Sequence, residues 1–183
     1  MKYFCRMQSI ATLKGKNDIS LKAIGQQDLK EMAALANDPA IAGNLRDSFP
    51  SPYSLQDAEV FFELIRQDKL NQHVWGIYLY ERIAGVITLT PQQDIYRHSA
   101  EIGYWLGAPY FGKGIMTEAV SLVTNYAFEA LGFLRVYAGV FAYNEASKKV
   151  LLKSGFHQEA IKRNAIIKNG ILHDEHLMVK MKA

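Results

Sequence analysis

The stretch Tyr104-Trp105-Leu106-Gly107-Ala108-Pro109-Tyr110-Phe111-Gly112-Lys113-Gly114-Ile115-Met116-Thr117-Glu118-Ala119 sets the arrangement of the elements around it. It is typical of the end of a strand, a turn that contains glycines and the start of a long helix. Glycine adopts backbone conformations that other residues avoid, and the first N–H groups of a helix have no partner inside the helix. Several N–H groups therefore converge where the helix begins, which predicts an anion-binding site.

The residues just before the turn, 99–106, predict a strand that delivers the chain to it. Successive side chains of a strand point to opposite faces of its sheet. Glu101 and Trp105 are therefore expected on one face and Tyr104 on the other.

The remaining elements are predicted from hydrophobic periodicity and from start and stop signals. Apolar residues recur at helical spacing in residues 28–37, in 115–131, and behind a capping box at Ser54-Leu55-Gln56-Asp57. A further short helix is expected between an Asn144 cap and Gly155, with Ala146 and Val150 facing inward. Strands are expected over residues 19–24, 73–80, 83–90, 135–142, 156–167 and 171–181, the last two joined by an Asn169-Gly170 hairpin turn.

These strands and helices interleave without the regular alternation of a fully parallel sheet. We therefore expect an α+β fold, built on a mixed, mostly antiparallel, bent sheet with helices on both faces. The 183 residues are 49% hydrophobic and 21% charged, enough for one core, so residues 1–183 are expected to form a single domain.

Composition and charge exclude several classes of partner. A formal net charge of +3, from 21 Lys and Arg against 18 Asp and Glu, is too weak and too scattered to indicate nucleic-acid binding. The start does not resemble a signal peptide, and no run approaches the ~20 apolar residues of a membrane span, so no membrane partner is expected.

Cysteine and histidine usage points to a cytoplasmic protein without a metal. The single Cys5 cannot form an internal disulfide and has no activating neighbour, which favours a reducing compartment and argues against an acetyl-cysteine intermediate. His173 and His176 lie three apart on an expected strand, hence on opposite faces, so shared metal ligation is not expected.

Three phosphate-binding motifs compete for Gly112-Lys113-Gly114. A P-loop needs Ser or Thr directly after its Lys, but Gly114 follows Lys113. A dinucleotide-binding turn needs a third glycine where Thr117 stands. The third interpretation depends on the motifs before and after the turn.

Four motifs follow one another at a characteristic spacing: Ala100-Glu101-Ile102-Gly103-Tyr104-Trp105-Leu106, Phe111-Gly112-Lys113-Gly114-Ile115-Met116-Thr117-Glu118-Ala119, Asn144-Glu145-Ala146-Ser147 and Val150-Leu151-Leu152-Lys153-Ser154-Gly155-Phe156. Together they resemble the GNAT acetyltransferase superfamily, and within it the ribosomal-protein N-terminal acetyltransferases of the RimJ/RimL type. The resemblance covers nearly the whole chain.

The resemblance implies acetyl-coenzyme A as cosubstrate. It implies that the pyrophosphate is held by the backbone amides of Phe111, Gly112, Lys113, Gly114, Ile115, Met116 and Thr117 at the start of the helix. It further implies that Tyr104, Trp105 and Leu106 pair with the pantetheine arm like an added strand. Asn144 would bond the pantetheine, and Lys149 would reach a phosphate of the nucleotide.

Two residues are candidates for acid and base chemistry. Glu101 is the candidate base, acting directly or through a water, because it lies on the strand that leads to the turn; the alternative is an exposed strand carboxylate. Ser147 is the candidate acid towards the leaving thiolate, because the resemblance places it near the thioester sulfur. It could instead orient the thiol, or only occupy the first helical turn beside the Asn144 cap.

The chain departs from the family pattern at two positions. Pro109 stands where the superfamily usually has Gln or Arg, a replacement common in this branch. Leu151 stands where many relatives have Tyr, which excludes a tyrosine acid from that position.

The acceptor stays open between several classes. An α-amine with a pKa of ~7.7–8.0 is partly neutral at pH 7, whereas a lysine amine at ~10.4 is not, so a weak base suffices for a protein N-terminus. The resemblance to the RimJ/RimL type makes direct acetyl transfer to a protein N-terminal amine the first hypothesis. The alternatives are a small-molecule amine, such as an antibiotic or amino acid, and a non-catalytic acyl-coenzyme A-binding module. The chain is expected to be a monomer or a homodimer, and residues 49–53 either wall a substrate cleft or belong to the core.

Overall fold

One eight-stranded sheet runs through the computed structural model, which describes residues 10–183. Its strands lie in the order β1-β2-β3-β4-β5-β6-β8-β7. The strands are β1 (Leu13–Lys14), β2 (Ile19–Lys22), β3 (His73–Leu79), β4 (Arg82–Pro91), β5 (Ser99–Leu106), β6 (Arg135–Phe141), β7 (His157–Lys168) and β8 (Ile171–Met181). Every neighbouring pair of these is antiparallel except β5 and β6, which confirms the predicted mixed, mostly antiparallel sheet.

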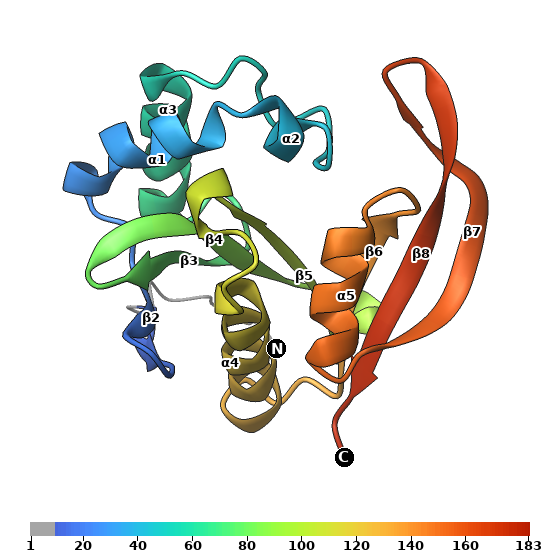
Figure 1. Cartoon of the computed structure of the whole chain (residues 1–183). Coiled ribbons are helices and arrows are strands. Elements are labelled where there is room, and N and C mark those ends of the chain that lie inside the picture. Colours follow the sequence, from blue (N-terminus) through green and yellow to red (C-terminus); the bar gives the residue numbers. More distant parts are fainter. Residues whose placement is uncertain (1–9) are drawn as a thin grey trace.

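Helices cover both faces of this sheet, as predicted. They are α1 (Leu29–Ala36), α2 (Pro39–Ala42), α3 (Leu55–Arg66), α4 (Ile115–Glu129) and α5 (Glu145–Lys153). Helices α1, α2 and α3 lie on one side of strands β3 to β5, and α4 lies on the other (Figure 1). Each face has its own core: Met32 and Tyr78 are central to the α1–α3 side, while Val120 and Val123 of α4 are fully buried on the other.

Local signals account for where the elements begin and turn. Ser54 and Asp57 form the predicted capping box of α3. The Asn144 side chain accepts a hydrogen bond from the Ser147 N–H at the start of α5. At the β7–β8 turn Asn169 has φ 51° and Gly170 φ 76°, the left-handed pair that a two-residue hairpin requires.

Two local predictions need correction. Helix α2 was not predicted, because its four residues are too few to show a periodicity. In α5 the fully buried side chain is Leu151, while Ala146 is exposed and Val150 only half-buried. The helix is turned so that Leu151 reaches the core beneath α4, where its larger apolar surface gains more from burial than that of Ala146.

The sheet opens between its two parallel strands. β5 pairs with β6 only from Ser99 to Glu101, opposite residues 135–137. Beyond Glu101, β5 stays paired with β4 and β6 stays paired with β8, while β5 and β6 diverge from each other. One edge of β5 over residues 102–106 is thus left without a strand partner, and this opening positions the site described below.

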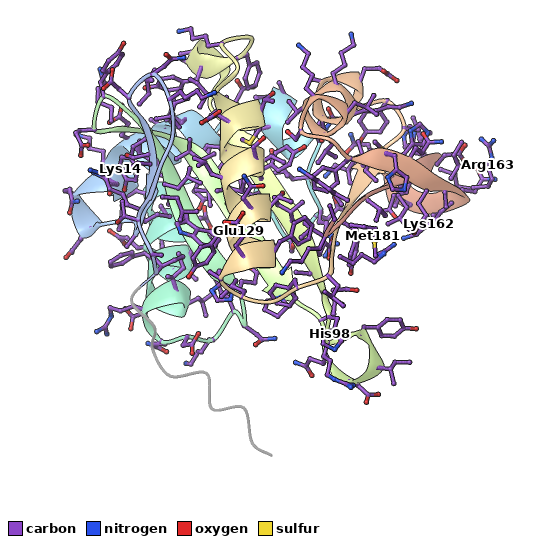
Figure 2. The ribbon with its side chains drawn as sticks, turned by 90° about the horizontal axis from the view of Figure 1, so that it is seen from below. Lys14, His98, Glu129, Lys162, Arg163 and Met181 are labelled. Carbon is purple, nitrogen blue, oxygen red and sulfur yellow. The ribbon has the colours of Figure 1, made fainter. Side chains whose placement is uncertain are left out.

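Two segments project from the body of the molecule when it is seen from the α4 side. The connection between β4 and β5, which carries His98, extends away from the sheet, as does the β7–β8 hairpin with Lys162 and Arg163 (Figure 2). Among residues 10–183, no helix combines the length and apolar character needed to cross a bilayer.

Candidate active site

A cleft of about 950 Å³ lies where β5 and β6 diverge. Its lining comes from the segment before α3, from α3 itself, from β4, β5 and β6, from the glycine turn and from α5. Since these elements stand on both faces of the sheet, the cleft joins the α1–α3 side to the α4 side. Its lining residues include a group at the glycine turn, from residues 111–117 with Lys149 and Lys153, called here the turn end. The remaining charged lining residues, Arg46, Asp57, Glu101 and Glu175, are called here the carboxylate end.

The cleft brings together nearly all the site residues predicted from sequence. Those that line it are Glu101, Tyr104, Trp105, Leu106, Phe111, Gly112, Gly114, Ile115, Met116, Thr117, Asn144, Ser147 and Lys149. Lys113 does not line it; its ammonium lies 5.8 Å from the centre of the Tyr110 ring. The binding and catalytic roles of all these residues stay predictions.

The turn end is shaped by two glycines in the left-handed conformation. Gly112 has φ 72° and Gly114 φ 76°, values that side-chain-bearing residues adopt only at a cost. The backbone N–H groups of residues 112–117 donate no hydrogen bond to another described residue. The start of the 15-residue helix α4 thus offers six backbone donors without a described partner, together with the positive end of the helix dipole, and this combination suits an anion.

Helix α5 supplies further polar groups beside the turn. Lys149 and Lys153 are exposed and line the cleft. The side-chain Oδ1 of Asn144 accepts the Ser147 N–H at 3.0 Å, and the side-chain NH₂ of Asn144 has no described acceptor, so it is available to a ligand. The residues fit a ligand with negative charge at the turn and polar groups along its length.

A pair of hydroxyl groups bridges the middle of the cleft. The Tyr104 hydroxyl lies 2.9 Å from Ser147 Oγ and 3.5 Å from the Ser147 carbonyl oxygen. Burial raises the pKa of Tyr104 well above that of a free phenol, so the hydroxyl keeps its proton. Sequence patterns missed this contact, because it joins residues 43 apart in the chain, on β5 and α5.

The carboxylate end is built around an ion pair. Arg46 Nη2 lies 2.5 Å from Glu101 Oε1, with side-chain exposures of 73% and 25%. Glu101 is therefore neither the freely exposed strand carboxylate nor an unpartnered base. No sequence pattern marked Arg46, which stands 55 residues earlier in the irregular segment after α2.

A second carboxylate, Glu175 of β8, also lines this end. It is paired with Lys162 Nζ at 2.7 Å and is 17% exposed. The pKa of the neighbouring Tyr137 is raised, mainly because the residue is buried and next because of the negative charge of Glu101. Among the side chains that line the cleft apart from the turn end, three are acidic, Asp57, Glu101 and Glu175, and one is basic, Arg46, while Lys162, the partner of Glu175, does not line it.

The segment that carries Arg46 is held from across the cleft. Lys168, near the tip of the β7–β8 hairpin, donates to the Leu45 carbonyl at 2.8 Å and to Asp47 Oδ1 at 2.7 Å. Tyr143 Oη donates to the Gly43 carbonyl at 2.7 Å. These bonds fix the position of Arg46 relative to Glu101.

Aromatic residues before α3 belong to the core and also form a wall of the cleft, so both alternatives given for residues 49–53 apply. Phe49 stacks on Tyr53 with ring centres 4.9 Å apart and meets the edge of Trp105 at 6.3 Å. All three line the cleft, and Tyr53 is also buried in the α1–α3 core, where burial raises its pKa to about 12.

No group of three or more metal-ligating side chains is arranged around a common point within residues 10–183. The His173 ring packs against the Tyr143 ring, with centres 4.7 Å apart. Cys5 lies outside the described residues.

Comparison with known proteins agrees with this geometry. A family model described as an acetyltransferase (GNAT) domain matches residues 18–157. The chain is 39% identical to the probable N-acetyltransferase YjcK of Bacillus subtilis (strain 168), over 62% of this chain and 64%, just under two thirds, of that protein. It is 32% identical to the putative ribosomal N-acetyltransferase YdaF of the same organism, over 81% of this chain and 75% of that protein. It is 26% identical to the spermidine N(1)-acetyltransferase of Escherichia coli (strain K12), over 84% and 81%.

Solved structures share the fold. The Mycobacterium smegmatis RimJ structure, in complex with CoA-disulfide, superposes with a TM-score of 0.82 at 19% identity, over 93% of this chain and 86% of that one. The microcin C7 self-immunity acetyltransferase MccE, in complex with acetyl-CoA and AMP, has a TM-score of 0.78 at 25% identity, over 91% and 94%. The resemblance seen in the four motifs is confirmed, and the chain belongs to the GNAT acetyltransferase family.

Proposed function

We propose that the protein is an N-acetyltransferase that moves the acetyl group of acetyl-coenzyme A directly to a primary amine, by preference the α-amine of a protein N-terminus. One observation carries the proposal: a single cleft passes through the opened sheet from a turn of free backbone amides to a paired carboxylate. Such a cleft can hold an anionic donor and an amine acceptor at the same time.

The turn end suits coenzyme A. The free amides of residues 112–117 would bind the pyrophosphate, and the helix dipole would add about 0.3–1 kcal/mol. Lys149 and Lys153 would meet the remaining phosphates. The unpaired edge of β5 over residues 102–106 offers backbone groups to the pantetheine amides.

The arm would then carry the thioester through the opening in the sheet. Glu101 is three residues before Tyr104 on β5, about 10 Å of extended chain. Glu101 faces the α1–α3 side with Trp105, while Tyr104 packs with the α4 side. A thioester in the opening would therefore meet Glu101 from one side and the Tyr104–Ser147 hydroxyl pair from the other.

The reaction uses these groups in turn. Glu101 takes a proton from the ammonium, directly or through a water, and the neutral amine attacks the thioester carbonyl carbon. The new C–N bond forms, and the C–S bond breaks as the intermediate collapses. The nitrogen gives up its second proton as the amide forms, and this proton passes by way of the Ser147 hydroxyl to the leaving sulfur, so that coenzyme A leaves as a thiol while Glu101 returns its proton to solvent. None of the described residues that line the cleft is a cysteine, and direct transfer is favoured over an acetyl-enzyme on this ground.

The acceptor preference rests on charge and on pKa. The excess of carboxylates at the carboxylate end favours a protonated amine over an anionic acceptor. The pKa of an α-amine, about 7.7–8.0, is much closer to neutral pH than that of a lysine amine, about 10.4, so an α-amine is deprotonated more easily. The 32% identity to a putative ribosomal N-acetyltransferase supports a protein N-terminus.

The same excess of carboxylates also suits a small polycation, which is the second candidate. A polyamine carries several ammonium groups, and Asp57, Glu101 and Glu175 line one end of the cleft. The 26% identity to a spermidine acetyltransferase supports this alternative.

An acceptor screen tests the proposal. The purified protein is incubated with acetyl-coenzyme A and with peptides that have a free N-terminus, the same peptides with a blocked N-terminus, Nα-blocked lysine, and polyamines. Release of coenzyme A is followed, and products are identified by mass spectrometry. We expect acetylation of free N-termini only. Turnover confined to polyamines would establish the second candidate, and tight binding of acetyl-coenzyme A without turnover on any amine would show a non-catalytic binding module.

A further inference from the structure

We propose that Tyr104 is a positioning residue: its hydroxyl donates to Ser147 Oγ, so that the proton of Ser147 itself is left to point at the sulfur of coenzyme A. The inference rests on the proposed function and extends it, since neither the sequence motifs nor the family resemblance assigned a role to the Tyr104 side chain.

Distances decide which hydroxyl donates. The Tyr104 proton has two described acceptors, Ser147 Oγ at 2.9 Å and the Ser147 carbonyl at 3.5 Å. The first is close to the usual O–H···O length, whereas the second is at the limit of a hydrogen bond. If Ser147 were the donor, the buried phenol proton would keep only the poor partner, and an ill-satisfied buried donor is costly. Donation from Tyr104 to Ser147 satisfies the phenol.

The hydroxyl proton of Ser147 is available to a ligand because it is not donated to a backbone carbonyl of the helix. Serine hydroxyls inside helices commonly donate to the carbonyl four residues earlier. Ser121 does so to Thr117 at 2.9 Å, and Ser154 does so to Val150 at 2.9 Å. Ser147 stands in the first turn of α5, and its hydroxyl bonds no described residue except Tyr104. Since Ser147 lines the cleft, its proton is free to turn toward a ligand bound there.

The hydrogen bond from Tyr104 makes the Ser147 hydroxyl a stronger hydrogen-bond donor than an isolated serine. A serine hydroxyl is a weak hydrogen-bond donor, but it becomes stronger when its oxygen accepts another hydrogen bond. Leu151, at the position where relatives carry a tyrosine, is fully buried in the core and cannot reach the sulfur. The phenol that contributes to this site is therefore Tyr104 of β5, and it acts on the sulfur through its hydrogen bond to Ser147. No proton leaves Tyr104 in this account, which agrees with the raised pKa of its buried hydroxyl.

A double-mutant cycle tests the coupling. Tyr104→Phe should lower kcat about 10-fold, the size of one hydrogen bond, and leave KM for acetyl-coenzyme A within about 2-fold. In the Ser147→Ala background the same Tyr104→Phe change should alter kcat less than about 2-fold, because Tyr104 acts only through Ser147. Equal losses in both backgrounds would show a merely structural role, and wild-type kcat in Tyr104→Phe or in Ser147→Ala would overturn the proposal.

Tyr78→Phe is the matched control. Tyr78 is also a buried phenol, but it donates to Asp28 Oδ2 at 2.5 Å on the α1–α3 side and does not line the cleft. Its loss should lower the melting temperature and leave kcat unchanged. A fall in kcat as large as that of Tyr104→Phe would attribute the effect to general destabilisation.

A second measurement needs no turnover and therefore separates this proposal from the proposed function. The thiol of bound coenzyme A is titrated by the ultraviolet absorbance of its thiolate. A donor aimed at the sulfur stabilises the thiolate, so its apparent pKa should be about 0.5–1 unit lower on the wild type than on Tyr104→Phe or Ser147→Ala. Equal thiol pKa values on all three proteins would overturn the proposal, even if no amine acceptor were found.

Discussion

The two ends of the cleft are built in opposite ways. The turn end consists of consecutive residues, 111–117, whose backbone amides are aimed by two left-handed glycines and by the start of α4. The carboxylate end consists of side chains from distant segments: Arg46 from the segment after α2, Glu101 from β5 and Glu175 from β8. Backbone sites of the first kind depend on local conformation, whereas sites of the second kind depend on packing across the sheet.

The two ends also differ in charge, and this difference separates their ligands. Free amides and lysines at the turn end attract phosphates, and the excess of carboxylates at the other end attracts an amine. The Tyr104–Ser147 pair stands between them. Substitutions should therefore affect the binding of the donor or of the acceptor, but rarely both.

Gly114→Glu should have the largest effect, because it tests the turn end directly. A side chain there strains a backbone at φ 76° and puts a negative charge among the free amides. We expect the Kd for coenzyme A, measured by isothermal titration calorimetry, to rise at least about 100-fold. Gly132→Glu is the control, since Gly132 has the same φ of 76° and the same open surroundings at the other end of α4. Unchanged affinity in Gly114→Glu would refute the assignment of the turn end.

Glu101→Gln should have the next largest effect, confined to the acceptor step. Loss of the base should lower kcat about 100-fold while the Kd for coenzyme A stays constant. Glu31→Gln is a matched control: Glu31 is 34% exposed and is paired with the exposed Arg82 at 2.7 Å, away from the cleft. Full activity in Glu101→Gln would leave Glu101 with only an ion-pairing role.

Lys168→Met should loosen the carboxylate end alone. The Lys168 side chain is only 11% exposed and bonds Leu45 and Asp47, which hold the Arg46 segment. We expect KM for the acceptor to rise about 5-fold, as one or two hydrogen bonds would give, with no change in coenzyme A affinity. Lys182→Met, which removes a bond to the Phe128 carbonyl away from the cleft, should leave KM unchanged. A weaker coenzyme A affinity in Lys168→Met would contradict the separation of the two ends.

Lys149→Ala should weaken coenzyme A binding by only about 3-fold, because an exposed ion pair contributes little and is screened by salt. The loss should shrink further as ionic strength rises. The neighbouring Lys148→Ala is the control, since Lys148 does not line the cleft. Equal effects of the two changes would show that only overall charge matters.

The smallest expected effect concerns the stability of the N-terminal turns of α3 and α5, which should respond differently to acid. Hydrogen bonds from Ser54, the N-cap of α3, lower the pKa of its capping-box partner Asp57, whereas Asn144 caps α5 without titrating. A carboxyl with a lowered folded-state pKa stabilises fully above its unfolded value of about 3.9, and this stabilisation is lost as pH falls through the folded pKa. Hydrogen-exchange protection at the start of α3 should therefore fall below about pH 4, and α5 should be spared. In Asp57→Asn this pH dependence should disappear, and a persisting dependence would assign it to another group.

Local structure was predicted correctly from the sequence where a few adjacent residues define it. The Ser54 cap, the Asn169-Gly170 turn and the strand–turn–helix around Gly112 were all found from short patterns. It failed for α2, which is too short to have a period, and for the buried face of α5. A nine-residue helix has few apolar positions, so the choice between Leu151 and Ala146 depended on where α4 stood.

The sequence by itself determined most of the elements and the glycine turn with its converging amides, because each follows from the conformational limits of residues adjacent in the chain. Only the tertiary structure decided that Arg46 holds Glu101 and that Tyr104 holds Ser147, pairs that are 55 and 43 residues apart. Such contacts depend on where β5 and β6 part and on which helix covers each face. Those positions result from packing the whole core, and no local pattern of residues encodes them.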